Sequence, residues 1–217
     1  IGYTFANGLR TILRQDPNVI MVGEIRDSEP AELAVHAALT GHLMFSTLHT
    51  NTAIGAIPRL IDMGIEPFLI ASSLRLVVAQ RLVRKICDKC KEEVEIFPGI
   101  KEKVMNEIKN IPQEELKKYE LDLTQGLKFY HGKGCDTCGD KGLSGRVAIY
   151  EVIPVSESVK NIIVEKNGNE ELLKEARDSM GIITIKQDGI LKLLAGYTTL
   201  EEIERVVEGK FGLTEED

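Results

Sequence analysis

All four cysteines of the chain lie in two C-x-x-C pairs, and this arrangement constrains the fold more than any other feature of the sequence. The pairs are Cys87/Cys90 and Cys135/Cys138, with 44 residues between them. Each pair forms a tight turn that offers two thiolates, and two such turns supply the four sulfur ligands of the tetrahedral site that Zn²⁺ prefers. We therefore expect a structural zinc ion that staples residues 87–138. Because a four-sulfur site is closed, this metal would not take part in catalysis.

Other states of the four cysteines stay open at this point. They can form two disulfides, remain as unbonded thiols, or hold an iron–sulfur cluster, which also takes four cysteine ligands. The chain shows no charged-then-apolar leader, and disulfides are rare in proteins that stay in a reducing compartment. The sequence therefore favours a metal over disulfides.

The charge balance excludes some classes of function. The 217 residues carry 27 Lys+Arg and 34 Asp+Glu, a formal net charge of −7, and only 5% are aromatic. This composition disfavours a protein that binds nucleic acid through bulk positive charge and base stacking. The longest apolar runs fall well short of the roughly 18 residues that span a membrane, so we expect no membrane insertion.

Charge also divides the chain into three segments, which we predict to be domains. Residues 1–86 carry 8 basic and 7 acidic groups, residues 87–138 carry 9 and 11, and residues 139–217 carry 10 and 16. Seven of the eight cations in the first segment are arginines, whose planar fork of donors suits phosphate oxygens. A surface that simply uses arginine for its charge is the alternative.

The first segment has the strand–helix rhythm of a parallel α/β sheet. Apolar runs predict strands at Val19–Val22, buried on both faces, and at Leu43–Leu48. Ser28 is the expected N-cap of the second helix, with Pro30 at its first position. The predicted helices are Phe5–Gln15, Glu29–Leu39 and Thr52–Met63.

The other two segments are mostly helical in pattern. We predict a strand at Val147–Val152, with a small helical bundle formed by the last four helices of the chain. The predicted helices are Lys101–Lys109, Gln113–Glu120, Ser156–Lys166, Glu170–Ser179, Thr184–Ala195 and Leu200–Glu208.

Polar residues follow both predicted strands. Glu24 comes just after the first strand, at the sheet edge where open α/β sheets bind ligands, and a carboxylate there can polarise a water or hold Mg²⁺. A solvated ion pair with Arg26 is the plain alternative. His42 and His49 flank the second strand, and their spacing predicts that they lie at its opposite ends.

Several short motifs along the chain together resemble those of a known protein family. They are Thr4-Phe5-Ala6, Gly8-Leu9-Arg10, Leu13–Pro17, Gly23–Asp27, Thr40–His42, Ser46–Asn51, Gln80–Leu82, Gly145-Arg146, Glu151, Asp188-Gly189, Lys192 and Gly196-x-Thr198-Thr199. Together with the two cysteine pairs, they resemble the type II secretion and type IV pilus assembly ATPases of the secretion ATPase superfamily. Retraction ATPases of that superfamily lack the cysteine pairs. The long insert between the pairs is more similar to the pilus-extension members.

The resemblance implies a fold and a function. It implies an α/β fold, the C-terminal part of a RecA-like P-loop ATPase core, with a zinc-knuckle insert and a small helical C-terminal subdomain. It further implies a cytoplasmic homo-hexamer that docks peripherally on a platform protein of the inner membrane, without entering the membrane or binding nucleic acid. There the motor would hydrolyse ATP with Mg²⁺ to polymerise pilin, or to drive type II protein secretion.

The resemblance also implies residue roles. Glu24 matches the Walker B glutamate that acts at Mg²⁺ and the attacking water. His42 and His49 match a histidine box that couples the γ-phosphate to the subunit interface. The remaining matches are three arginines implied to contact phosphate: Arg10, Arg14 and, less directly, Arg26. We expect Glu24, the two histidines and the early pair Arg10 and Arg14 to converge on one nucleoside triphosphate.

One family motif is missing from the chain. No Gly-Lys-Ser or Gly-Lys-Thr occurs, so the Walker A loop that cradles the β- and γ-phosphates is absent. We expect the chain to be the C-terminal part of a longer protein, with an exposed apolar sheet edge and no ATP turnover of its own. Two rival classes remain, a non-catalytic zinc-knuckle interaction module and a nucleic-acid translocase built on a similar core.

Overall fold

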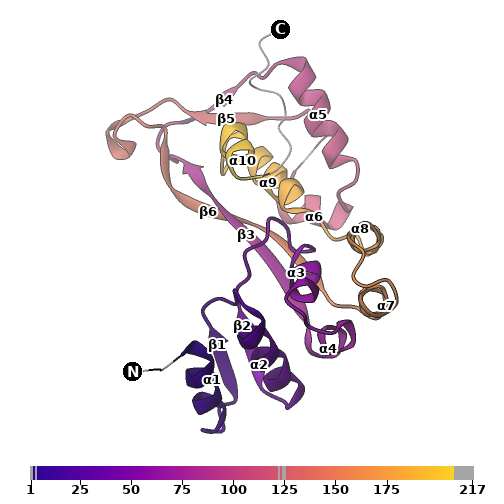
Figure 1. Cartoon of the computed structure of the whole chain (residues 1–217). Coiled ribbons are helices and arrows are strands. Elements are labelled where there is room, and N and C mark those ends of the chain that lie inside the picture. The colour runs from indigo at the N-terminus through magenta and orange to yellow at the C-terminus, as the bar shows by residue number, and fades with distance from the viewer. Residues whose placement is uncertain (1, 3, 122, 124–125, 208–217) are drawn as a thin grey trace. The chain divides into compact units, whose positions relative to one another are not determined.

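The described part of the chain comprises residues 2, 4–121, 123 and 126–207 of a computed structural model (Figure 1). It forms two compact units, and the chain enters each of them twice. The first unit contains residues 1–78 and 152–180, and the second contains residues 79–151 and 181–217. These units are discontinuous in sequence, so their borders differ from those of the three segments that charge delimits.

The first unit contains a parallel pair of strands, β1 (Val19–Val22) and β2 (Leu43–Ser46). Val19 pairs with Leu43 and Val22 pairs with Ser46, which confirms both predicted strands, although the second is two residues shorter. The expectation that β1 is buried on both faces is wrong. Its residues alternate, because α2 (Ser28–Leu39) lies against the pair on one side, while the side chain of Met21 is 75% exposed on the other.

Beside the strand pair, the described part of the first unit contains helices, of which α2 contacts β2 (Figure 1). They are α1 (Phe5–Leu13), α2, α3 (Ala56–Asp62), α4 (Pro67–Ser73), α7 (Glu157–Glu165) and α8 (Glu170–Ser179). The cap of α2 is Asp27 and not Ser28, so that Pro30 is its third residue. α3 begins four residues later than predicted, because the hydroxyl of Thr52 accepts the N–H of Gly55 and holds a turn ahead of the helix.

The second unit is built around a helix with almost no exposed side. This helix, α9, packs against α5, α10 and β5, and its residues Ile190 and Leu191 are fully buried. Phe129 and Ile203 complete the same core. The elements are α5 (Pro98–Ile108), α6 (Gln113–Lys118), α9 (Ile185–Leu194), α10 (Leu200–Val206) and the antiparallel strands β4 (Lys91–Val94) and β5 (Phe129–Gly132).

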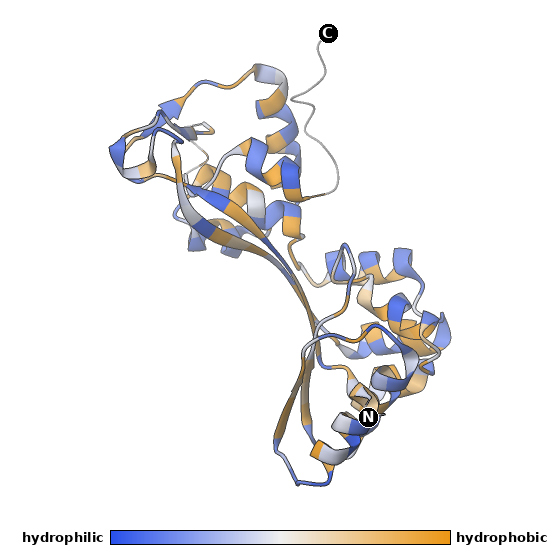
Figure 2. Ribbon diagram, turned by 60° about the vertical axis from the view of Figure 1, so that its left-hand side comes forward, coloured by the Kyte–Doolittle hydropathy of each residue, from blue (hydrophilic) through white to orange (hydrophobic). Residues whose placement is uncertain are grey.

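Two long strands pair with each other and belong partly to each unit. β3 spans Leu76–Ile86 and β6 spans Leu143–Pro154. Hydrophobic residues recur along both strands, with hydrophilic residues between them (Figure 2). The strand predicted at 147–152 is the middle of β6, whereas β3 was not predicted.

The four helices predicted for a terminal bundle divide between the units. α7 and α8 belong to the first unit, where α7 packs against α4, and α9 and α10 belong to the second. Glu208, the predicted last residue of the final helix, lies outside the described residues. Among the helices of the described part, none is both long and apolar enough to cross a membrane.

Candidate functional site

The carboxyl ends of β1 and β2 bring two of the predicted site residues together. The strands are parallel and end in register, so the residues that follow them emerge at the same edge of the sheet. Glu24 follows β1 by two residues, and His49 follows β2 by three. The Nε2 atom of His49 lies 2.7 Å from Oε2 of Glu24.

A third predicted residue completes this cluster. The Nη2 atom of Arg26 lies 2.6 Å from Oε1 of Glu24, so each carboxylate oxygen has its own cationic or hydrogen-bonding partner. The side chain of Glu24 is 39% exposed, and those of Arg26 and His49 are more exposed still. The cluster is therefore open to solvent and to a ligand.

The electrostatics of the cluster keep Glu24 ionised. The hydrogen bond with His49 lowers the pKa of the Glu24 carboxyl most; burial raises it, and the hydrogen bond and charge of Arg26 add to the lowering, so that the pKa lies below its ordinary value. At neutral pH the group is thus a carboxylate, the form that can orient a water molecule or bind a divalent cation.

His42 lies at the other end of β2, as its spacing predicts. Its Nδ1 atom lies 3.1 Å from the carbonyl oxygen of Ala37 and 3.2 Å from the hydroxyl oxygen of Thr40. These contacts tie the ring to the end of α2. The expected convergence with Glu24 is therefore not present for His42.

The contacts of Glu24 in the described part of the chain are with Arg26 and His49, and neither Arg10 nor Arg14 is among them. The guanidinium of Arg10 pairs with Glu29 at 2.8 Å and contacts the side chain of Asn7. Arg14 is the exposed C-cap residue of α1. Of the five residues expected to converge, the structure joins Glu24 and His49, with Arg26 paired to the same carboxylate, and leaves Arg10, Arg14 and His42 elsewhere in the first unit.

The four cysteines come together in the second unit. Their sulfur atoms all lie within 4.8 Å of one another, and three pairs are separated by 3.7, 3.8 and 3.9 Å. In a tetrahedral site with zinc–sulfur bonds of about 2.3 Å, neighbouring sulfurs are about 3.8 Å apart. A disulfide needs about 2.05 Å. The sulfur positions thus fit a tetrahedral metal site.

Backbone groups around the cysteines support the thiolate form. The N–H groups of Cys135 and Gly142 both donate to the sulfur of Cys138, at 3.3 Å each. A hydrogen bond with the backbone of Cys138 lowers the pKa of Cys135 to about 7, whereas burial raises that of Cys90 to about 12.

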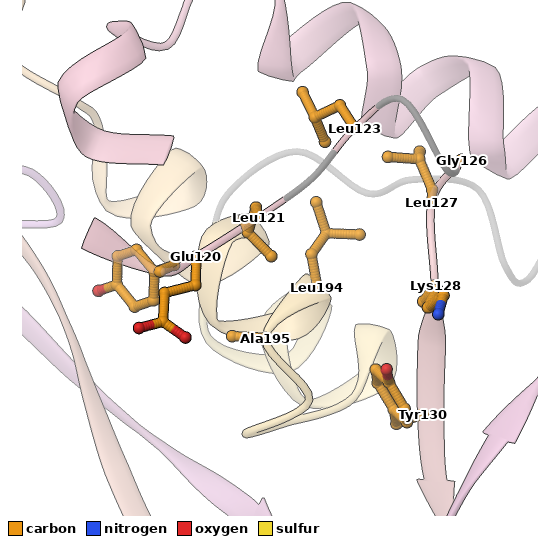
Figure 3. Close-up of a pocket in the computed structure, with 10 residues that line it drawn as sticks. Glu120, Leu121, Leu123, Gly126, Leu127, Lys128, Tyr130, Leu194 and Ala195 are labelled. Atoms are coloured by element: carbon orange, nitrogen blue, oxygen red, sulfur yellow. The ribbon is translucent and has the colours of Figure 1, made fainter. Parts of the chain in front are cut away.

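A pocket of about 400 Å³ lies in the second unit and involves none of these groups. Figure 3 shows the side chains of Leu121, Leu123, Leu127 and Leu194 around it. Among the described residues that line it, none is a predicted site residue. Next to it, the hydroxyl of Tyr119 donates to the buried carboxylate of Asp188.

Comparison with known proteins gives matches over nearly the whole chain. The family model described as "Type II/IV secretion system protein" matches residues 1–205. The type II secretion system ATPase E of Vibrio cholerae is 46% identical over 208 residues, which are 96% of this chain and 38% of that protein. The type IV pilus assembly ATPase PilB of Thermus thermophilus is 46% identical over 202 residues, 93% of this chain and 21% of that protein.

A solved structure agrees with these matches. The crystal structure of the pilus retraction motor PilT with bound ADP superposes with a TM-score of 0.61 at 27% identity, over 95% of this chain and 44% of that chain. The chain thus spans well under half the length of each of these proteins.

Proposed function

The chain belongs to the type II/IV secretion system protein family, and from this premise we propose that it forms part of a motor ATPase that drives type IV pilus assembly. The cluster of Glu24, Arg26 and His49 at the carboxyl ends of two parallel strands carries the proposal. It has the place and the chemistry that ATP hydrolysis requires, because an ionised carboxylate and a guanidinium face solvent together at a ligand-binding edge.

Each side chain has a task in this proposal. Glu24 orients the attacking water and accepts its proton, and its oxygens are also suitable ligands for Mg²⁺, which would neutralise phosphate charge. Arg26 supplies positive charge for the phosphate oxygens. His49 holds one oxygen of Glu24, so that the carboxylate keeps one direction.

The test is ATP hydrolysis by the intact protein in the presence and absence of Mg²⁺. We expect Glu24→Gln to lower kcat at least 100-fold, because the amide cannot accept the proton. Glu32→Gln, at an exposed position on α2, removes the same charge and should leave kcat unchanged. If Glu24→Gln hydrolyses ATP as fast as an active unmodified protein, Glu24 is not the catalytic carboxylate. If neither protein hydrolyses ATP, the chain is better explained as a non-catalytic zinc-knuckle module.

Pilus assembly and type II secretion are both supported by relatives of equal identity. The long insert between the cysteine pairs is the feature that favours pilus assembly. The proposal predicts that cells carrying Glu24→Gln lose their surface pili, counted by electron microscopy. Normal piliation combined with loss of a secreted enzyme from the medium would favour the secretion motor instead.

We also propose that the four cysteines hold one structural Zn²⁺. The sulfur separations of 3.7–3.9 Å support this assignment. Native mass spectrometry of reduced protein should find one zinc per chain, and Cys87→Ser or Cys135→Ser should abolish it. Thr137→Ser, within the second cysteine turn, should retain the metal. Iron in place of zinc, or no metal, would overturn the assignment.

The assembly and its location follow from the same proposal. We propose a homo-hexamer that binds, from the cytoplasm, a platform protein at the inner membrane. Mass measurement of the intact protein by light scattering should give six copies in the presence of nucleotide. A stable monomer with full ATPase activity would contradict the hexamer.

A further inference from the structure

Thr47 makes two hydrogen bonds to the residues on either side of Glu24. Its hydroxyl donates to the carbonyl oxygen of Gly23 at 2.6 Å, and its own carbonyl oxygen accepts the N–H of Ile25 at 3.0 Å. One residue after the end of β2 therefore holds both peptide groups that flank the candidate catalytic residue. The Ser46–Asn51 motif contains Thr47, but the sequence assigns it no separate role.

We propose that Thr47 is a positioning residue for Glu24. The two bonds fix the backbone on both sides of Glu24, and this sets the direction in which its Cα–Cβ bond leaves the chain. The side chain of Ile25 adds an anchor, because it is 5% exposed and packs into the first unit. Of these restraints, only the bond from the hydroxyl depends on the side chain at position 47.

The side-chain partners of the Glu24 carboxylate are not sufficient to hold it in one position. Arg26 and His49 hold the oxygens of Glu24, but both side chains are about two-thirds exposed or more. Exposed ion pairs are weak restraints, since water and salt compete with them. A bound phosphate would also draw Arg26 toward itself. The backbone bonds from Thr47 persist in that situation, so they keep Glu24 in place while its side-chain partners change.

The position of Thr47 also explains why a hydroxyl is needed. The regular pairing of β1 and β2 ends at Val22 and Ser46, so the carbonyl of Gly23 is left without a partner from the strand ladder. A hydroxyl one residue further along can reach it, whereas a valine of the same shape cannot. Without that bond, the carbonyl turns to water, and the peptide that leads into Glu24 gains freedom to rotate.

This role presupposes the ATPase activity proposed above, so its test separates the two. On the intact protein, Thr47→Val should lower kcat about 10-fold with KM changed less than 2-fold, since a misdirected catalytic group slows the chemical step and not substrate binding. Thr47→Ser keeps the hydroxyl and should restore kcat to within 3-fold. Thr11→Val is the matched control, because its hydroxyl donates to a backbone carbonyl at 2.8 Å within α1.

A second measurement does not depend on activity. Hydrogen exchange of residues 23–27 should become several-fold faster in Thr47→Val and stay normal in Thr47→Ser, with the melting temperature of both variants unchanged within 2–3 °C. If Glu24→Gln is inactive and Thr47→Val has full kcat, the positioning role is overturned while the proposed function stands. It is also overturned if Thr47→Ser fails to restore kcat, because the methyl group would then be responsible. If the unmodified protein hydrolyses no ATP, the proposed function fails. If hydrogen exchange of residues 23–27 is also unchanged in Thr47→Val, the positioning role of Thr47 fails as well.

Discussion

Replacing Gly132 with alanine should weaken zinc binding at the proposed four-cysteine site, although Gly132 is not one of the proposed ligands. A Cβ at this position would lie 2.0 Å from the carbonyl oxygen of Gly142, and Cβ contacts under 3.0 Å are essentially never found. The two backbones must therefore separate by at least about 1 Å. Gly142 cannot move alone, because its carbonyl accepts the N–H of Cys87 at 2.9 Å and its N–H donates to the sulfur of Cys138 at 3.3 Å.

The size of the effect follows from the tolerance of metal sites. Metal–ligand distances vary by only about 0.2 Å. Gly142 is hydrogen-bonded to one cysteine of each pair, so a shift of about 1 Å at Gly142 is about five times larger than the ligand distances tolerate. Changes to groups that support metal ligands typically cost about 10- to 100-fold in affinity. We expect a loss in this range for Gly132→Ala, which corresponds to about 1.4–2.7 kcal/mol of metal-binding free energy.

The assay is competition for zinc against a chromogenic chelator at neutral pH, with reduced protein. Gly99→Ala is the control, because a Cβ there meets nothing within 4 Å and Gly99 lies in the first turn of α5, where alanine is favourable. The control should keep its affinity for zinc. If Gly132→Ala binds one zinc ion as tightly as the unmodified protein, the contact between the two glycines does not shape the site.

Three further results are expected. Burial raises the pKa of Glu202, but hydrogen bonds from Arg84 and Arg205 outweigh it and lower the pKa from 4.5 to about 2. The ionised group therefore contributes about 2 kcal/mol to the free energy of unfolding, after allowance for the half-exposed guanidiniums, and this contribution is complete above pH 4.5 and lost toward pH 2. In urea unfolding, Glu202→Gln should be less stable than the unmodified protein at pH 7 and equally stable near pH 2. Asp188→Asn should cost about 3–5 kcal/mol in the same assay, because it leaves the buried ammonium of Lys192 without its carboxylate; a cost below 1 kcal/mol would refute this. The 217 residues alone should show no ATP turnover in a phosphate-release assay, since they contain no Gly-Lys-Ser or Gly-Lys-Thr.

The sequence was most informative where structure depends on neighbours in the chain. The apolar run Val19–Val22 and the turn after it predict both the strand and the direction in which Glu24 leaves it. Parallel pairing with β2 then places His49 at the same edge and His42 at the opposite one. Once the two strands are expected to be parallel, the positions of Glu24, His42 and His49 along the chain fix which of them share an edge of the sheet.

The sequence was less informative where partners are distant. β3 pairs with β6, which begins 67 residues after β3 does, and its three basic residues interrupt the apolar pattern that marks a strand. The contacts of the arginines depend on the fold in the same way. Arg10 and Arg26 both have the chemistry to bind phosphate, but only the fold decides that Arg10 pairs with Glu29 and that Arg26 pairs with Glu24.

The insert between the cysteine pairs has a second source of stability that its spacing does not reveal. Phe129, Val104 and Leu116 belong to the insert, yet they are buried in one core with Ile190 and Ile203 from the end of the chain. Each such side chain contributes about 1.5–3 kcal/mol by leaving water, so this core does not need a metal to form. The expected staple therefore acts locally. Loss of zinc should free the cysteine turns themselves, while α5 and α9 remain packed and keep slow hydrogen exchange.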